Sequence, residues 1–349
     1  MIFFFIKFIK HVKIIIDSYY MKRGEAKYIW HIMDIENVEV EKKIKVVFMG
    51  TPLFSVPVLD KLIKNYNVVA VVTQPDKRIG RGGKIGITPI KQLASNNNIL
   101  VLQPERIKEE YNEIIALEPD IIITCAYGQI IPKELLDYPK YGCINVHASL
   151  LPKLRGGAPI QRAIMNGYDK TGITIMYMAE KMDSGDIIKS KEIDIPIDMN
   201  YKTLHDKLSL LGSELLIEVL PDIISGNINP IKQDENEVTY GFNISKEDEK
   251  INFSNSKLNI YNQIRALDGF SGAYCNFQGK RLKVWKSMIT DNHFSEQLDG
   301  EITKIYKNGI GVKVSDGEII LLEVQPEGKK RMDALSFANG VDLLGKVLE

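Results

Sequence analysis

From Lys45 onward, the sequence alternates short, continuous apolar runs with stretches of helical periodicity. The runs KVVFMG and VVAVVTQ enclose the helical segment VPVLDKLIKN, and ILVL, DIIITCA and GCINVH follow, with ITPIKQLASNN and NEIIAL between them. Strands that are apolar along their whole length are buried on both faces, as in a parallel sheet covered by helices. The alternation therefore predicts an α/β domain with a doubly wound, mostly parallel sheet.

The second half of the chain has a different rhythm. A long helical pattern between Asp198 and Ser225 ends the α/β part, and a polar stretch follows. The short strand-like runs RLKVWKSMI, GEITKIYKN, GIGVKVSDG and EIILLEVQP come next and are separated by turn residues, which is typical of a small β-barrel. A chain of 349 residues favours two domains. We expect an α/β domain over 44–230, a linker over 231–247 and a β-domain over 248–349.

Residues 1–43 differ from the rest of the chain. Lys7, Lys10 and Lys13 interrupt the first apolar run, so it makes a poor transmembrane helix, and we expect no membrane association. The stretch also lacks the small-residue cleavage site of a secretory signal. We interpret it as a leader outside the fold. Translation from a start codon placed too far upstream and organellar targeting both remain open as its origin.

The charge balance and the spacing of the cysteines and histidines argue against overall electrostatic binding of nucleic acid and against a metal site. Lys+Arg and Asp+Glu are both 45, so whole-chain charge does not indicate nucleic-acid binding, and any such binding must come from local patches. Cys125, Cys143 and Cys275 fit no metal-ligand spacing and are expected to be buried thiols in a reducing cytosol. The histidines show no ligand spacing either, so we expect no metal site.

The end of the run GCINVH carries the strongest chemical signal. Asn145 and His147 are two residues apart, so on a strand they project from the same face. An amide beside an imidazole at a strand's carboxyl end suits a carbonyl whose oxygen gains negative charge. A histidine in such a place is more often structural when it stands alone. Asp183, in the turn MDSGDII, could orient His147, although Asp is also a common turn former.

The runs AYGQIIPKELL, GCINVHASLLPKLRGGAPIQRAI and MDSGDII resemble the folate-dependent formyltransferases, and the likeness extends from about Lys45 to the C-terminus. The resemblance implies that Asn145, His147 and Asp183 are catalytic and that 10-formyltetrahydrofolate is the formyl donor. It places the folate along the turn Ser149, Leu150, Leu151 and Pro152, with the pterin in a pocket under the loops near Ala126 and Asp183. Gly157 and Ser184 replace the family's more common Ala and Thr with other small residues.

Two further features resemble the branch of the family that formylates the α-amino group of initiator methionyl-tRNA. The first is the Gly-rich basic loop TQPDKRIGRGGKIGITPIK, and the second is an OB-like C-terminal domain with the sequence LLEVQPEGKKRM. Phosphate contacts are expected from both, because Lys and Arg position a nucleic-acid backbone. A solvated surface loop is the alternative for the first feature. The implied tRNA ligands are Lys77, Arg78, Arg81, Lys84, Lys329, Lys330 and Arg331.

The resemblance implies a monomeric bacterial enzyme of the cytoplasm. Related reactions share the catalytic residues, so a formyltransferase acting on another amine and a hydrolase of the same folate remain alternatives. A non-catalytic RNA-binding protein would not need all three of Asn145, His147 and Asp183. The run GTPLFSVP lacks the GxGxxG spacing, which argues against a dinucleotide-dependent dehydrogenase.

Overall fold

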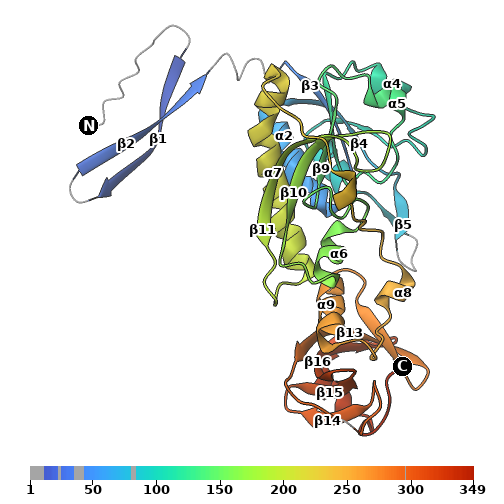
Figure 1. Ribbon diagram of the computed structural model, residues 1–349. Helices are drawn as coiled ribbons and strands as arrows, with labels where there is room; N and C mark the ends of the chain where they lie inside the picture. Colours follow the sequence, from blue (N-terminus) through green and yellow to red (C-terminus); the bar gives the residue numbers. More distant parts are fainter. Residues whose placement is uncertain (1–11, 23–24, 35–42, 80–83, 295) are drawn as a thin grey trace. The chain divides into compact units, whose positions relative to one another are not determined.

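The computed structural model describes residues 12–22, 25–34, 43–79, 84–294 and 296–349 (Figure 1). The chain forms two compact units. One consists of residues 1–144 and 217–227, and the other of residues 145–216 and 228–349.

The first unit contains the parallel strands that the apolar runs predict. β3 pairs in parallel with β4 and with β8, and β4 pairs in parallel with β7. All five residues of β8 are buried, as expected for a strand covered on both faces. Among the strands and helices of this unit are β3 (Lys45–Gly50), η1 (Leu53–Ser55), α2 (Val56–Asn65), β4 (Asn67–Val72), α3 (Pro89–Asn96), β7 (Leu100–Leu102), α4 (Asn112–Ile115), β8 (Ile121–Cys125) and α5 (Lys133–Leu136).

Local chemistry explains where the helix α3 begins. The Thr88 side chain accepts a hydrogen bond from the backbone N–H of Lys91, and Pro89 occupies the first turn, where its missing N–H costs nothing. The strands belong to a seven-stranded sheet with the order β11-β10-β9-β8-β3-β4-β7, in which β9 spans Cys143–His147. The prediction of a doubly wound, mostly parallel α/β sheet is confirmed.

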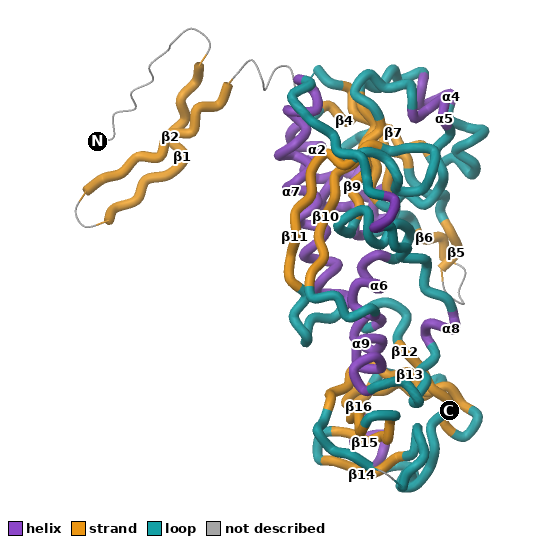
Figure 2. The backbone as a smooth tube through the Cα atoms, in the orientation of Figure 1, coloured by secondary structure: helices purple, strands orange, loops and turns teal. Residues whose placement is uncertain are grey.

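An antiparallel pair that the sequence pattern did not predict forms one edge of this sheet. β10 (Lys170–Tyr177) and β11 (Ile187–Asp194) run side by side (Figure 2). Asp183 lies in the connection between them. The long helix α7 (Tyr201–Ser225) packs closely near β9 and β10, because Gly212 has no side chain. A Cβ on Gly212 would lie 2.9 Å from Val146 and 3.4 Å from Ile173.

The C-terminal part of the second unit is an antiparallel sheet with the order β12-β13-β16-β15-β14, and β17 pairs with β16. Ile260, Ile264 and Leu267 of α9 are buried in the same hydrophobic core as this sheet. The prediction of a C-terminal β-domain is confirmed. The remaining elements of the second unit are α6 (Pro159–Met165), η2 (Glu235–Glu237), α8 (Lys246–Glu249), α9 (Lys257–Leu267), β12 (Ala273–Phe277), β13 (Lys280–Ile289), β14 (Ile302–Tyr306), β15 (Gly309–Val314), β16 (Gly317–Pro326), β17 (Met332–Asp333) and α10 (Ala334–Ala338).

Two antiparallel hairpins lie outside these sheets. β1 (Val12–Lys22) pairs with β2 (Glu25–Asp34) within the predicted leader, whose residues 1–11, 23–24 and 35–42 lie outside the described residues. β5 (Lys77–Ile79) pairs with β6 (Lys84–Gly86) within the predicted basic loop. The interpretation of residues 1–43 as a leader outside the fold stays a prediction.

The cysteines are buried thiols, as expected. Cys125, Cys143 and Cys275 are unpaired with one another, and burial raises the pKa of each thiol to about 12. Such thiols stay protonated at neutral pH and are poor nucleophiles. Within the described part of the chain, no helix combines the length and the apolar character that crossing a membrane requires.

Candidate active site

The strand β9 presents Asn145 and His147 from one face. The intervening Val146 points to the opposite face, where it meets Gly212 of α7. His147 is buried, with 6% of its side chain exposed, and Asn145 is partly exposed. The alternation of side chains along a strand therefore brings the amide and the imidazole together, as the spacing predicts.

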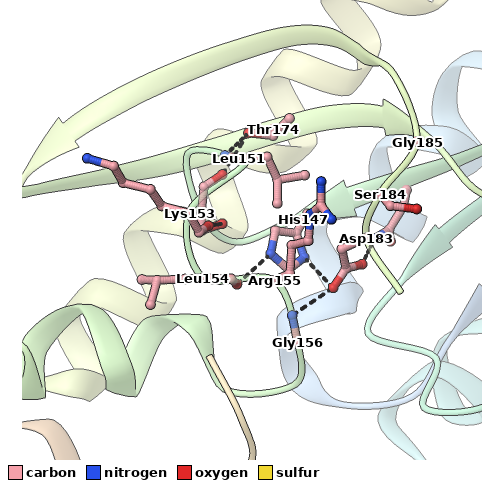
Figure 3. Close-up of polar contacts among 12 residues, drawn as sticks. His147, Leu151, Lys153, Leu154, Arg155, Gly156, Thr174, Asp183, Ser184 and Gly185 are labelled. Carbon is pink, nitrogen blue, oxygen red and sulfur yellow. Dashed lines mark hydrogen bonds and ion pairs between the residues drawn. The ribbon is translucent and has the colours of Figure 1, made fainter. Parts of the chain in front are cut away.

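Asp183 meets both of these residues (Figure 3). Its Oδ1 accepts a hydrogen bond from Asn145 Nδ2 at 3.4 Å, and its Oδ2 lies 3.7 Å from His147 Nδ1. The backbone N–H of Gly156 donates to the same Oδ2 at 2.8 Å, which is the shortest of the three contacts. The structure therefore brings together all three residues that the sequence marks as catalytic.

The other nitrogen of His147 has a partner that the sequence did not indicate. His147 Nε2 lies 3.1 Å from the carbonyl oxygen of Leu154 (Figure 3). A carbonyl can only accept, so Nε2 carries a hydrogen and Nδ1 of the neutral ring carries a lone pair. The contact between Nδ1 and Asp183 becomes an ion pair only when the ring takes up a second proton. The ring nitrogen with the lone pair is therefore the one that faces Asp183.

Leu154 itself is in the left-handed backbone region, with φ 61°. This conformation is uncommon for a branched residue and persists only where neighbours stabilise it. Here the N–H of Leu154 donates to Thr239 Oγ1 at 2.9 Å, and the residue is buried. A residue distant in sequence therefore helps to aim the Leu154 carbonyl at His147.

The predicted folate turn Ser149–Pro152 is well connected. Thr174 Oγ1 donates to the carbonyl of Ser149 at 2.7 Å and accepts from the N–H of Leu151 at 3.2 Å. The Ser149 hydroxyl donates to the carbonyl of Lys153 at 2.6 Å. Ser149 and Leu151 are buried, whereas Leu150 and Pro152 are partly exposed. The backbone of this turn is thus rigidly placed beside the strand that carries His147.

A cavity of about 420 Å³ borders the same turn. Its lining combines apolar and polar groups, among them the charged residues Lys153, Asp169 and Lys170. The remaining lining residues are Ser149, Leu150, Leu154, Gly167, Tyr168 and Thr171.

The predicted linker lies against the turn of Asp183 and the loop that follows His147. Within it, the segment 233–241 hydrogen-bonds to the loop 152–158 through several backbone groups, including Arg155 N–H to the Thr239 carbonyl at 2.9 Å and Gly241 N–H to the Arg155 carbonyl at 2.7 Å. The Gln233 amide donates to the carbonyls of Asp183 and Gly185 at 2.8 and 2.7 Å. The polarity of this stretch predicts a connecting role. It does not predict which groups its side chains bind, so the contacts of Gln233 were missed. Its role as an interdomain linker stays a prediction.

The predicted tRNA ligands fall on two surfaces. Lys77 is exposed at the start of β5, the backbones of Arg78 and Lys84 lie in β5 and β6, and Arg81 lies outside the described residues. Lys329 and Lys330 are exposed between β16 and β17.

Arg331 is already engaged by neighbouring side chains. It forms ion pairs with Asp268, at 3.1 Å, and with Glu323. Its guanidinium also lies over the ring of Trp285, 4.7 Å from the ring centroid. The contact of Arg331 with tRNA stays a prediction. A tRNA phosphate would compete with Asp268 and Glu323 for the guanidinium.

Within the described ranges, no cluster of three or more His, Cys, Asp or Glu residues could hold a metal ion.

Comparison with known proteins identifies the family. Residues 42–220 match the formyl transferase family, and residues 243–342 match the formyl transferase C-terminal domain. The chain belongs to the formyl transferase family. The methionyl-tRNA formyltransferase of Bacillus licheniformis is 52% identical over 303 residues, which cover 86% of this chain and 96% of that protein. The methionyl-tRNA formyltransferase of Bacillus subtilis is 50% identical over 310 residues, covering 86% and 98% of the two chains.

A solved structure confirms the fold at lower sequence similarity. The N-formyltransferase from Helicobacter canadensis, in complex with folinic acid and dTDP-3-aminofucose, superposes with a TM-score of 0.61. It is 22% identical and covers 80% of this chain and 99% of that one. The family assignment therefore rests on the sequence relatives, and the solved structure supports the architecture.

We predict that Gly185→Ala destabilises the turn that carries Asp183. A Cβ on Gly185 would overlap the carbonyl oxygen of Tyr177, and that oxygen belongs to backbone that cannot rotate away. We expect a loss of roughly 1–3 kcal/mol in the free energy of unfolding, measured by urea denaturation. Gly340→Ala is the matched control, because the nearest atom to a Cβ there is 3.9 Å away. Equal stabilities for the two variants would contradict this close approach.

Proposed function

We propose that this chain transfers the formyl group of 10-formyltetrahydrofolate to the α-amino group of initiator methionyl-tRNA. The observation that carries the proposal is the convergence of Asn145, His147 and Asp183 at the end of β9 in a chain of this family. The identity of about half of all aligned residues to curated methionyl-tRNA formyltransferases supports the choice of acceptor.

The three residues suit an acyl transfer from nitrogen to nitrogen. As the neutral amine attacks the formyl carbon, the formyl oxygen gains negative charge and the amine nitrogen must lose a proton. Asn145 donates a hydrogen bond to that oxygen, and His147 in its protonated form lowers the energy of the same charge. Asp183, at 3.7 Å from His147 Nδ1, stabilises the protonated ring. The pair thereby holds the proton between its loss from the amine and its return to the leaving nitrogen.

The turn Ser149–Pro152 is the proposed location of the folate. Support comes from its rigid attachment to Thr174 and from the cavity of about 420 Å³ that borders Ser149 and Leu150. This turn follows β9 directly in the chain, so a formyl donor bound there would lie close to His147. The folate supplies the activated formyl group, and the protein supplies the charge stabilisation.

The basic residues of the β5–β6 hairpin and of the β16–β17 connection are the proposed phosphate contacts. They are Lys77, Arg78, Arg81, Lys84, Lys329, Lys330 and Arg331. Because the whole chain has a formal net charge of zero, these local groups must supply the electrostatic attraction. We also propose that the enzyme acts as a monomer in the bacterial cytoplasm.

We predict that the purified chain formylates initiator methionyl-tRNA much faster than elongator methionyl-tRNA. The measurement is the initial rate of formyl transfer from 10-formyltetrahydrofolate to each acceptor at equal concentration. A nucleotide amino sugar and water serve as alternative acceptors in parallel reactions. Equal rates on the two tRNAs would contradict an initiator role, and faster transfer to the sugar or to water would replace the proposed acceptor.

We predict that Asn145→Ala and His147→Ala each lower kcat by roughly a hundred- to a thousandfold, because each removes charge stabilisation that develops in the transition state. The unfolding midpoints of both variants should stay near that of the parent, which urea titration checks. Ser184→Ala is the control, since its hydroxyl donates to the exposed carbonyl of Lys181. A variant with near-normal turnover would remove that residue from the site.

We predict that Arg81→Ala raises the KM for tRNA and leaves the KM for the folate unchanged. Phosphate contacts position a nucleic acid without taking part in the chemistry. The two KM values are compared at several salt concentrations, and the salt dependence of tRNA binding should become less steep by about one counterion. A change confined to the folate KM would show that the hairpin has a different role.

A further inference from the structure

We propose that Gln233 is a positioning residue of the catalytic reaction, which holds the turn of Asp183 in the conformation that places its carboxylate against His147. This inference rests on the proposed function and adds to it a residue from the predicted linker.

The orientation of the Gln233 amide follows from its neighbours. Arg155 donates to Gln233 Oε1 through Nε at 3.0 Å and through Nη2 at 2.9 Å. A guanidinium can only donate, so the group that faces it must be the amide oxygen. The Gln233 Nε2 therefore faces away from Arg155, where it donates to the carbonyls of Asp183 and Gly185. Both hydrogens of the amide nitrogen and the amide oxygen are thus used.

The turn that receives these hydrogen bonds needs support. Asp183 has φ 48°, in the left-handed region that side-chain-bearing residues adopt only when their surroundings stabilise it. The two carbonyls that Gln233 binds lie on either side of Ser184, so one side chain spans the turn. Met182 is exposed, and the Ser184 hydroxyl donates to the Lys181 carbonyl within the same turn.

The Asp183 carboxylate is tied to the same junction. Gly156, whose N–H donates to Asp183 Oδ2, directly follows Arg155. The backbone of Arg155 is bound on both sides by the segment 233–241, through Thr239 and Gly241. Arg155 therefore connects two groups that hold Asp183. Its side chain binds Gln233, which donates to the Asp183 backbone, and its chain neighbour Gly156 donates to the Asp183 carboxylate. A change at Gln233 should move the carboxylate relative to His147.

The test compares Gln233→Glu and Gln233→Met with the parent. The Gln233→Glu variant would keep the size and the Arg155 contact but could no longer donate when ionised, and Gln233→Met removes the donor without adding charge. We expect kcat for methionyl-tRNA formylation to fall about ten- to a hundredfold in both variants, because a displaced catalytic group loses its alignment. Both KM values should change by less than about threefold, since the lost alignment affects the transition state.

The matched control is Gln263→Glu. Gln263 Nε2 also donates to two carbonyls, those of Asp248 and Lys250, at 2.8 and 2.9 Å. These acceptors belong to the α8 region and not to the catalytic turn. The same chemical change there should leave kcat within about twofold of the parent, as expected for a site without a link to the reacting groups.

Two further measurements distinguish positioning from general stabilisation. If Gln233 acts through Asp183, then Gln233→Met adds little to the loss already caused by Asp183→Asn, so the double variant is about as active as Asp183→Asn alone. Hydrogen exchange of the Gly156 amide, which donates to Asp183, should accelerate in Gln233→Met and not in Gln263→Glu.

Specific outcomes would overturn the inference. A kcat near that of the parent in both Gln233 variants would overturn it, and so would an equal loss of kcat in Gln263→Glu. It would also be overturned if the losses of activity in Gln233→Met and Asp183→Asn were fully additive in the double variant. A parent enzyme that does not formylate methionyl-tRNA would refute the proposed function instead. In that case the exchange rate of the Gly156 amide still decides whether Gln233 supports the Asp183 turn.

Discussion

Hydrogen bonds hold Asp183 both at its carboxylate, which also accepts from Asn145 Nδ2, and at the backbone of its turn. The Gly156 N–H binds the carboxylate itself, and the Gln233 amide binds the backbone carbonyls on either side of the turn. Without these contacts, a non-glycine residue with φ 48° would relax toward a more common conformation. The separation of 3.7 Å between Asp183 Oδ2 and His147 Nδ1 depends on this placement.

The buried guanidinium of Arg155 explains why the segment 233–241 is bound so closely. Only 3% of Arg155 is exposed, and a buried charge is tolerated only when it is paired and hydrogen-bonded. Glu235 supplies the opposite charge, and hydrogen bonds from Arg155 lower the pKa of that carboxyl group. Glu235 is otherwise exposed, so solvent screens the ion pair. The Gln233 side-chain oxygen accepts two further hydrogen bonds from the same guanidinium.

Much of the architecture follows from patterns that are local in sequence. α2 has the bounds that its helical segment predicts, and the apolar runs from Lys45, Val68 and Ile121 are all strands. The pair β10–β11 was not predicted, because β11 is mostly exposed and lacks an apolar run. β11 is an edge strand of the described sheet.

The sequence by itself determined the chemistry that is available in this protein. The spacing of Asn145 and His147 places them on one face of a strand, because side chains alternate along an extended backbone. Only the tertiary structure decided how that chemistry is arranged. The Leu154 carbonyl selects the protonated nitrogen of His147, and Gln233 reaches Asp183 across 50 residues of sequence. No local pattern encodes such partners, because a hydrogen bond needs only proximity and direction, and long-range folding supplies both.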